Sequence, residues 1–517
     1  MKKSIFFVTV LTVCFASCRM NEQDEIFSKN NEMIHEKVSL LDEIYSKEPD
    51  AGPLRPFAKA LYSAMEESPM LREIIKMKAL ERFNKEYDVL YQFIMNERIE
   101  NGLCVRDLLL KYFESEEALA AIEARHPTLT IFVPELPEEC FSAKSWNTAE
   151  QVPAVAIHPT KQHNIVLISK YGFFDENNDE FVLEAGLIPA FPVVVLKDNA
   201  RVVVTKNEQS RSEALNNRNS NYVFDFTDDF FDRNKEEKGI SQKGLVPTLL
   251  LDQKVKDAYE IYNGVDGWQR DYVYYGITPA NQKGPYDQNY WESIVYFRLS
   301  DKNTPEQALW YITNGPNDPT LKPFVVGSTT LPWTTGNYAF RIFTQVGSTT
   351  TYASTIEKLF IASPGELFEV TYKKTPGLAY KVDVTGFKTM ILDLKLFKWD
   401  LKTCAAVIKI TITKENPGTT ITKTDTWSSQ FAGNFGFDIG FGEDVKIGLK
   451  FGATSTTTKG TTFQTQTKLE NKSLGDVLVY FEDKIISSKT MYGSTTIAYS
   501  IADYESGYYT IALAPTK

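Results

Sequence analysis

Residues 431–452 carry the pattern that most restricts how this chain folds. Every large apolar side chain between Phe431 and Phe451 stands at an odd-numbered position, and the even-numbered positions hold small or polar residues. An apolar residue at every second position predicts β-strands that are apolar on one face only. The odd-numbered apolar residues are Phe431, Phe435, Phe437, Ile439, Phe441, Val445, Ile447, Leu449 and Phe451.

A short turn signal divides this stretch into two halves. The triplet 442–444, Gly-Glu-Asp, is typical of the turn of a β-hairpin. The flanking residues, from Thr419 and up to Ser473, are rich in Thr and Ser. Two hypotheses stay open for the apolar face of this hairpin. It packs on a protein core, as one face of many antiparallel sheets does, or it enters lipid, where a spanning strand needs about 9–11 residues of such alternation.

The first 18 residues have the composition of a bacterial export signal. Two lysines precede an apolar run at 5–16, and small residues lead to Cys18. The tetrapeptide 15–18, Phe-Ala-Ser-Cys, resembles the lipobox of bacterial lipoproteins, which implies a lipid on Cys18. We expect residues 1–17 to be a signal peptide and residues 18–50 to be a tether to the membrane. An ordinary secretory signal, with Cys18 incidental, is the alternative.

The remainder predicts an α+β protein of several domains. Residues 51–127 have apolar spacings of three and four and are expected to form a helical domain. Residues 128–205 read as a small β-rich domain, and residues 206–244 have the composition of a polar linker or long loop. Residues 245–517 are expected to be antiparallel, as a sandwich or an elongated sheet, and to include the hairpin 431–452.

Local signals place several elements within these sections. Ser68 followed by Pro69 predicts the start of a helix, and helical spacing continues through 87–94. Residues 252–262 and 305–312 are helical candidates. The aromatic run 271–279, DYVYYGITP, is expected to be a strand, with Arg270 and Asp271 paired at the surface.

The composition argues against several classes of function. The formal net charge is −11 and no long run of Lys or Arg occurs, so a nucleic-acid partner is not expected. Only four histidines are present, and the chain has no nucleophile elbow, phosphate loop or HExxH motif. The pair His158 and His163 is expected to be a solvated loop pair, and the run beginning at Asp175 lacks the glycine of an EF-hand. We therefore expect no catalytic residue, no cofactor and no metal.

Six aromatic residues between 259 and 275 are the candidates for ligand binding. Exposed rings stack on sugars or on apolar groups of a partner, whereas buried rings pack in the core. Both interpretations stay open, with the core interpretation favoured. The six residues are Tyr259, Tyr262, Trp268, Tyr272, Tyr274 and Tyr275.

The stretch 419–473 resembles the pore-forming region of aerolysin-type toxins, where Ser/Thr-rich strands flank an amphipathic segment that unrolls into a membrane barrel. The chain as a whole is similar to large lipoproteins of Bacteroidota, which implies a place in the outer membrane or at the cell surface. The leading hypothesis is a non-catalytic, lipid-anchored envelope protein that binds a ligand or a partner, such as another protein, through its β-rich C-terminal half. The alternatives are an aerolysin-like pore former, which acts on a target membrane through 431–452, and a surface glycan-binding protein.

Overall fold

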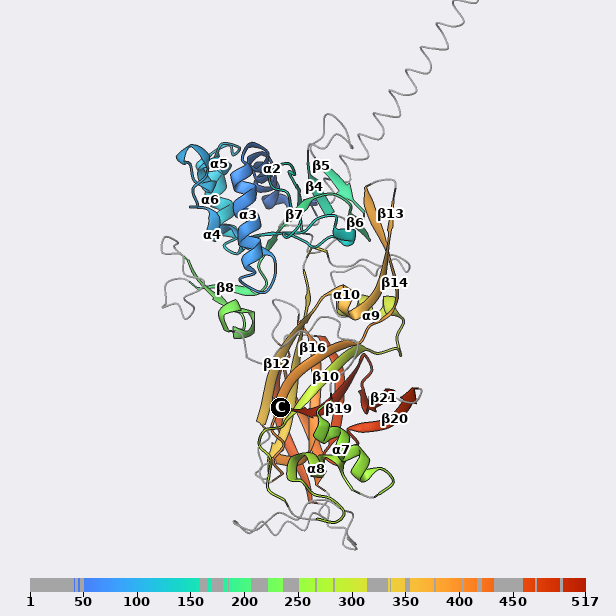
Figure 1. Ribbon diagram of the computed structural model, residues 1–517. Coiled ribbons are helices and arrows are strands. Elements are labelled where there is room, and N and C mark those ends of the chain that lie inside the picture. Colours follow the sequence, from blue (N-terminus) through green and yellow to red (C-terminus); the bar gives the residue numbers. More distant parts are fainter. Residues whose placement is uncertain are drawn as a thin grey trace, which may run out of the picture.

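The computed structural model forms two units, drawn one above the other in Figure 1. The upper unit comes from the described residues of 51–205 and the elongated lower unit from those of 251–517. Helices lie mainly in the N-terminal part and antiparallel strands in the C-terminal half, so the predicted α+β class is confirmed. The structure describes residues 41, 45–46, 51–158, 165–169, 180–184, 186–205, 222–235, 251–265, 267–281, 284–313, 333–334, 336–348, 354–375, 378–401, 404–415, 421–431, 459–469, 472–492 and 496–517.

Capping side chains explain where helices of the upper unit begin. The Ser68 hydroxyl accepts a hydrogen bond from the Leu71 backbone N–H at 3.0 Å, and Pro69 is the first helical residue, as predicted. Ser115 accepts from the Ala118 N–H in the same way. The helices are α2 (Ala51–Glu67), α3 (Pro69–Glu81), α4 (Tyr91–Ile94), α5 (Val105–Leu110) and α6 (Glu116–Arg125), with short 3₁₀ turns η1 (Glu100–Gly102) and η2 (Pro137–Glu139).

One sheet connects the two N-terminal sections of the chain. Strand β1 (Asp88–Leu90) comes from the helical section and pairs antiparallel with β2 (Leu129–Phe132). The expected helical spacing through 87–94 is therefore wrong for β1, because the same apolar spacing fits a buried strand followed by one helical turn. The strand order is β1-β2-β7-β3-β4-β5, in which only β3 and β7 are parallel. The other strands are β3 (Ala154–Ile157), β4 (Ile165–Ile168), β5 (Glu180–Leu183) and β7 (Val193–Asp198).

The lower unit is a sandwich of two antiparallel sheets, each four-stranded within the described residues. Phe297 of one sheet contacts Phe340 and Phe360 of the other, with ring centroids 5.3 and 5.1 Å apart, so the core lies between the sheets. The β10 sheet has the order β15 (Met390–Phe397), β10 (Trp291–Leu299), β23 (Tyr509–Thr516) and β22 (Asp503–Glu505). The β11 sheet has the order β12 (Ser354–Ala362), β11 (Tyr338–Ser348), β16 (Cys404–Lys414) and β19 (Lys472–Tyr480).

A long hairpin ties the lower unit to the upper one. Strands β13 (Phe368–Lys374) and β14 (Ala379–Phe387) pair with each other and rise beside the upper unit in Figure 1. There β14 pairs with β6 (Leu187–Pro189), in the register Ala379↔Pro189. Because β6 and β14 are far apart in the sequence, this pairing fixes the two units to each other.

Residues 222–235, in the predicted linker, form structure between the two units, and we call them the clasp. Strand β9 (Val223–Phe226) pairs with β8 (Val202–Thr205), and the 3₁₀ turns η4 (Asp229–Phe231) and η5 (Arg233–Lys235) follow. Phenylalanines of the clasp pack in an apolar cluster that takes residues from both units. The cluster consists of Leu90, Val202, Phe224, Phe226, Phe231, Ala339, Leu359 and Ile361.

The aromatic run 271–279 is not a strand, so that prediction is wrong. Residues Gln269–Tyr275 form helix α8, which ends at Gly276 with a φ of 63°. The Gly276 N–H returns to the Tyr272 carbonyl at 2.9 Å, and glycine adopts this left-handed conformation without strain. Aromatic residues favour strands only where the tertiary context suits them. The predicted helices at 252–262 and 305–312 are confirmed as α7 (Gln253–Tyr262) and α9 (Pro305–Thr313). The lower unit also contains helix α10 (Pro364–Leu367) and the antiparallel strand pair β20 (Ile486–Tyr492) and β21 (Thr496–Ile501).

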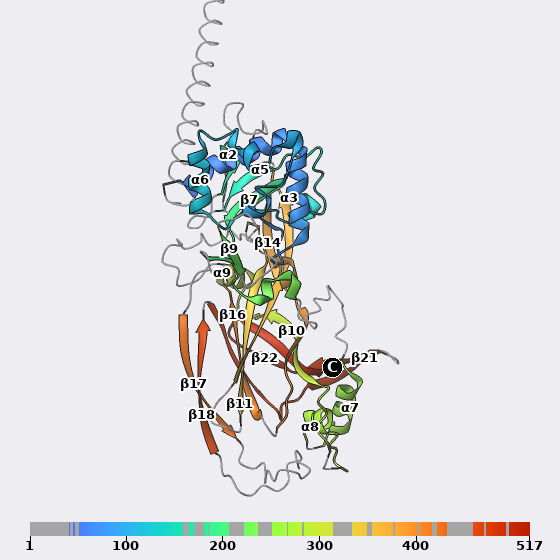
Figure 2. The ribbon, with the colours of Figure 1, turned by 90° about the vertical axis from the view of Figure 1, so that its left-hand side faces the viewer.

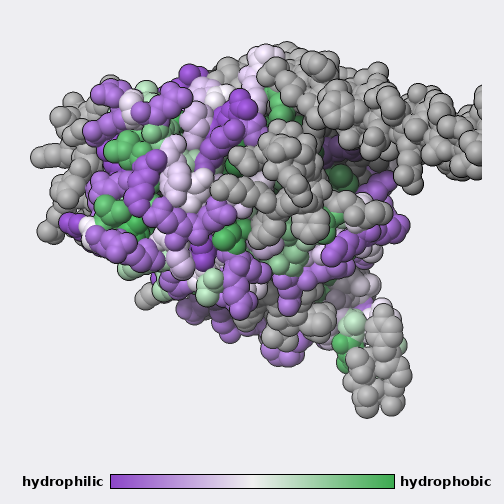
Figure 3. Space-filling model, turned by 90° about the horizontal axis from the view of Figure 1, so that it is seen from above, coloured by the Kyte–Doolittle hydropathy of each residue, from purple (hydrophilic) through white to green (hydrophobic). Residues whose placement is uncertain are grey.

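Seen from above, hydrophilic residues separate the apolar patches on the molecular surface (Figure 3). Helix α3 contributes exposed apolar side chains, namely Met70, Met77 and Leu80. Scattered exposure of this kind is ordinary for a protein surface. None of the described helices is long and apolar enough to cross a membrane.

Candidate functional site

Strands β17 (Ile421–Phe431) and β18 (Lys459–Leu469) form a ribbon that stands beside the sandwich. Each strand has 11 residues, and they pair without a break from Ile421↔Leu469 to Phe431↔Lys459. Within the described residues, neither strand pairs with a strand outside the ribbon. Figure 2 shows the ribbon along one side of the lower unit, with β17 outermost.

The ribbon flanks the predicted hairpin 431–452 on both sides. Phe431 is the last residue of β17, whereas the other apolar candidates and the turn 442–444 lie outside the described residues. Paired residue numbers in the ribbon add up to 890 (421 + 469 and 431 + 459), so the midpoint of the register is residue 445. The centre of the predicted turn, Glu443, differs from this midpoint by two positions. Because this sum is even, odd-numbered positions pair with odd-numbered positions. Every apolar candidate of the predicted hairpin also stands at an odd-numbered position.

The β11 sheet has an apolar inner face and a more polar outer face. Inner residues of β16 are Ile408, Ile410 and Ile412, each fully buried. The alternate residues Lys409, Thr411 and Thr413 are polar, yet only 8, 6 and 0 % exposed. On this side β18 contacts β11 and β17 contacts β16. Figure 2 shows the ribbon on the side of the sandwich away from β10. The ribbon therefore stands next to the outer face of the β11 sheet, which combines these polar residues with the buried ring of Phe343, the partner of Thr411 in the register.

The six aromatic candidates lie on α7 and α8 or beside them. The rings of Tyr262, Tyr274 and Tyr275 are buried, at 7, 0 and 1 % exposure. The Tyr262 hydroxyl donates to the Ile277 carbonyl at 2.9 Å, and the Tyr274 hydroxyl donates to Glu292 at 2.9 Å. Buried rings present no face to a sugar, so these three serve the core in this structure. The half-buried candidates, which pack against the same core, are Tyr259, Trp268 and Tyr272.

A fully buried ion pair joins α8 to the β10 sheet. The side chains of Arg270 and Glu292 are both 0 % exposed, and an Arg270 Nη2–Glu292 Oε1 distance of 2.7 Å joins them. Arg270 also donates to the Asp483 carbonyl at 2.7 Å. The expectation that Arg270 and Asp271 pair at the surface is wrong, because both are buried and the partner of Arg270 is 22 positions away.

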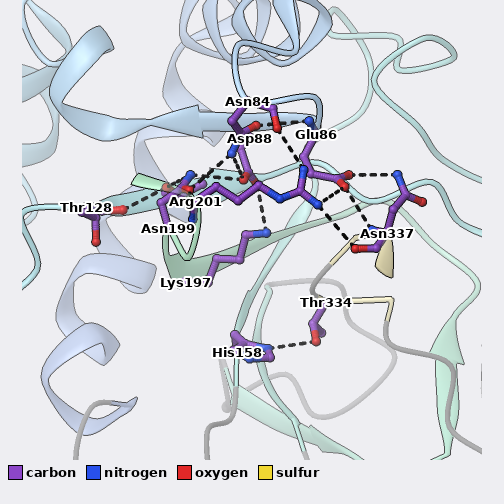
Figure 4. A network of polar contacts seen from close by, with 11 residues as sticks. Asn84, Glu86, Asp88, Thr128, His158, Lys197, Asn199, Arg201, Thr334 and Asn337 are labelled. Atoms are coloured by element: carbon purple, nitrogen blue, oxygen red, sulfur yellow. Dashed lines mark hydrogen bonds and ion pairs between the residues drawn. The ribbon is translucent and has the colours of Figure 1, made fainter. Parts of the chain in front are cut away.

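A second polar network lies where the upper unit meets the lower one (Figure 4). Glu86, 3 % exposed, accepts hydrogen bonds from Arg201 at 2.8 Å and from the Asn337 backbone N–H at 3.1 Å. Gly336 permits this approach, since a Cβ at that position would stand 2.8 Å from Glu86 Oε2. Asn337 immediately precedes β11, so the carboxylate of an upper-unit residue binds the first residues of the lower sandwich.

Polar side chains beside Glu86 complete the same network. Asp88 accepts from Asn84 at 2.7 Å and from Asn199 at 3.2 Å, and Lys197 Nζ lies 2.9 Å from its other oxygen. In Figure 4 these side chains converge from β1, from the turn before it and from the end of β7. Buried polar groups that satisfy one another in this way specify a single arrangement of the elements that carry them.

The sequence contained only a weak signal for these residues. The segment 197–201, Lys-Asp-Asn-Ala-Arg, interrupts an apolar run and is typical of a turn. That pattern indicates neither that Arg201 turns inward nor that Glu86 is its partner. The pairing depends on folding together residues 115 positions apart.

His158 is a structural residue in this part of the molecule. Its Nδ1 lies 2.9 Å from the Thr334 hydroxyl, so it links the upper unit to the segment before β11. Desolvation and the nearby Lys197 charge lower the pKa of His158 to about 4, so the ring is neutral at pH 7. No group of three or more His, Cys, Asp or Glu among the described residues is arranged to hold a metal ion. His163, the run at Asp175 and Cys18 lie outside those residues.

No protein-family model, curated protein or solved structure matches this chain.

Proposed function

We propose that this chain is a pore-forming protein, in which the β17–β18 ribbon carries the amphipathic stretch 431–452 into a target membrane. The observation that supports this most directly is the ribbon itself, whose 11-residue strands pair only with each other within the described part. Its register pairs odd-numbered with odd-numbered positions, so the apolar positions of the stretch would share one face of a hairpin that continued this register. The alternation in that stretch extends over the length of a membrane-spanning strand.

The mostly polar composition of β16 on the face next to the ribbon also supports the proposal. Separation from this face would return Lys409, Thr411 and Thr413 to water at little hydrophobic penalty. It would also expose the ring of Phe343, which pairs with Thr411 and is 1 % exposed, at about 1.5–3 kcal/mol. Separation at the inner face would expose Ile408 and Ile410, at about 1.5–3 kcal/mol for each buried side chain. The sandwich therefore keeps its core when the ribbon leaves.

Dye release from liposomes tests this function with the chain that follows Cys18. We expect the wild-type protein to release dye and Phe437→Asp and Ile447→Asp to release much less, because a carboxylate on the lipid face of a spanning strand is destabilising. Asn434→Asp is the matched control, since it adds the same carboxylate at an even-numbered position. Equal release by Phe437→Asp and Asn434→Asp, or none by the wild type, would contradict pore formation.

A second candidate function is the display of the lower unit to a protein partner by a lipid-anchored envelope protein. The elongated shape favours it, because α2 begins in the upper unit and the sandwich extends away from that unit (Figure 1). An anchor at Cys18 would then hold the upper unit nearer the membrane and present the sandwich outward. Cys18→Ala should move the protein from the membrane fraction to the soluble fraction; unchanged fractionation would remove the anchor from this proposal.

Glycan binding is a third candidate function, supported by fewer aromatic residues than the sequence suggested. Of the six aromatic candidates, only the half-buried Tyr259, Trp268 and Tyr272 retain partly accessible rings. A glycan array probed with the wild type and with Trp268→Ala tests it. Binding that Trp268→Ala leaves unchanged would show that these rings are not the site.

A further inference from the structure

The clasp is bonded to the upper unit along its length. The Thr227 N–H donates to the Arg201 carbonyl at 2.9 Å, and the Arg233 N–H donates to the Phe83 carbonyl at 3.3 Å. Lys85 Nζ lies 3.7 Å from the centre of the Phe230 ring. Backbone bonds and a cation–π contact therefore hold residues 222–235 against the upper unit.

One arginine of the lower unit holds the clasp from the other side. Arg341 on β11 lies 3.0 Å from Asp228 of the clasp, 3.0 Å from Glu357 of β12, and 2.7 Å from Glu415. The Arg341 side chain is 14 % exposed, and those of Glu415, Asp228 and Glu357 are 15, 26 and 50 % exposed. The contacts to Glu415 and Asp228 are thus the more sheltered, where a charge-assisted bond is strongest.

The position of Glu415 gives this cluster its significance. Glu415 directly follows β16, and the ribbon begins six positions later at Ile421. Its own backbone N–H donates to the Ala339 carbonyl at 2.9 Å, which holds the chain against β11 at this point. Arg341 therefore contacts Asp228 of the clasp and also Glu415, which lies just before the start of the ribbon.

We propose that Arg341 is a latch through which the upper unit restrains the ribbon. While Asp228 and Glu415 share its guanidinium, the chain entering β17 is held at the β11 sheet. Withdrawal of Asp228 releases Arg341 from the clasp, so the Arg341–Glu415 pair no longer ties the chain entering β17 to the upper unit. The structural coupling stands on these contacts alone, and its consequence for membranes rests on the proposed pore-forming function.

Hydrogen exchange of the full chain tests the latch without requiring a pore. Asp228→Asn removes the charge that faces Arg341 and keeps the oxygen that accepts the Phe230 N–H at 2.8 Å. Loss of a charge-assisted bond should raise exchange in peptides of 421–431 and 459–469 by about tenfold. Dye release, measured in parallel, should become faster in the same variant.

Two matched controls separate the latch from general loosening. Glu357→Gln removes a carboxylate from the same arginine but from the neighbouring strand, and Asp229→Asn removes the 80 % exposed partner of Lys235 within the clasp. Neither should change exchange in the ribbon. Equal exchange in Asp228→Asn and Glu357→Gln overturns the latch, whatever the dye release. Faster exchange in Asp228→Asn, without dye release by any form, supports the latch and overturns the pore-forming function instead.

Discussion

Two adjacent residues of α8 show what burial does to a charge with and without a partner. Arg270 is paired with Glu292 and remains charged, since the nearby carboxylate compensates for the loss of water. Asp271 is equally buried, but neither carboxylate oxygen has a hydrogen-bond partner in the described part of the chain. Desolvation therefore raises the pKa of Asp271 well above its usual value.

Asp271→Asn is expected to remove part of the pH dependence of stability. Because the folded-state pKa exceeds the unfolded value of about 3.9, the folded state retains a proton that the unfolded state releases. The free energy of unfolding then falls as the pH rises from about 4 towards the folded-state pKa. The variant lacks this loss, so its stability relative to the wild type grows by up to about 1.4 kcal/mol per pH unit in that range. Urea unfolding at a series of pH values measures the difference.

The control for this prediction is a carboxyl group whose pKa is lowered, and not raised, in the folded state. Lys373 lies 2.6 Å from Asp383 and lowers the pKa of that exposed carboxyl, so its ionised form contributes to stability above the unfolded pKa and loses that contribution as the pH falls. Asp383→Asn should therefore lose stability relative to the wild type at neutral pH. Parallel pH curves for the wild type and Asp271→Asn would show that Asp271 does not titrate in this way.

At the scale of the element, α8 shows how a glycine and a packed core outweigh strand propensity. The composition of the run YVYYG favours a strand. In the structure, however, Tyr274 and Tyr275 belong to helix α8, and their side chains are buried in the core. Gly276 ends that helix in a left-handed conformation, and a Cβ there would meet no atom within 4 Å. The requirement for glycine at this position is therefore conformational and not steric.

Gly276→Ala should reduce the free energy of unfolding by about 1–2 kcal/mol, the cost of a left-handed conformation for a residue with a Cβ. Gly365→Ala is the matched control, since a Cβ at Gly365 in α10 also meets nothing within 4 Å and Gly365 has no positive φ. Chemical unfolding of both variants gives the comparison. Equal losses would mean that the αL conformation of Gly276 is not the cause.

At the scale of the whole molecule, a sheet pairing, an apolar cluster and a buried polar network join the two units. The pairing of β14 with β6, the cluster around the clasp, and the bonds of Glu86 all cross the junction. Each buries groups that would otherwise face water. We therefore expect the two units to unfold together in calorimetry.

Arg201→Met should weaken this coupling. The variant leaves Glu86 buried without its cation, and breaking a buried pair of this kind costs about 3–5 kcal/mol. A separate transition at lower temperature is the expected calorimetric result. Lys144→Met removes an exposed cation from the same unit, where Lys144 and Glu135 are 68 and 54 % exposed, and should leave the transition within about 0.5 kcal/mol. A single unshifted transition in Arg201→Met would mean that the network does not hold the units together.

The sequence by itself determined what depends on neighbours along the chain. Ser68 and Pro69 begin a helix through one capping bond and one preset dihedral angle, and these act within three residues. The α+β class and the helices at 252–262 and 305–312 followed from local periodicity in the same way.

Only the tertiary structure decided which distant groups meet. It placed β1 in a sheet, turned the aromatic run into α8, made part of the linker into a clasp, and joined Arg341 to Asp228 across 113 positions. The physical reason is that desolvation and pairing depend on what surrounds a group in space, whereas periodicity records only which face of an element a residue occupies. For the same reason, the odd-numbered face of 431–452 could be recognised in the sequence, but what that face contacts could not.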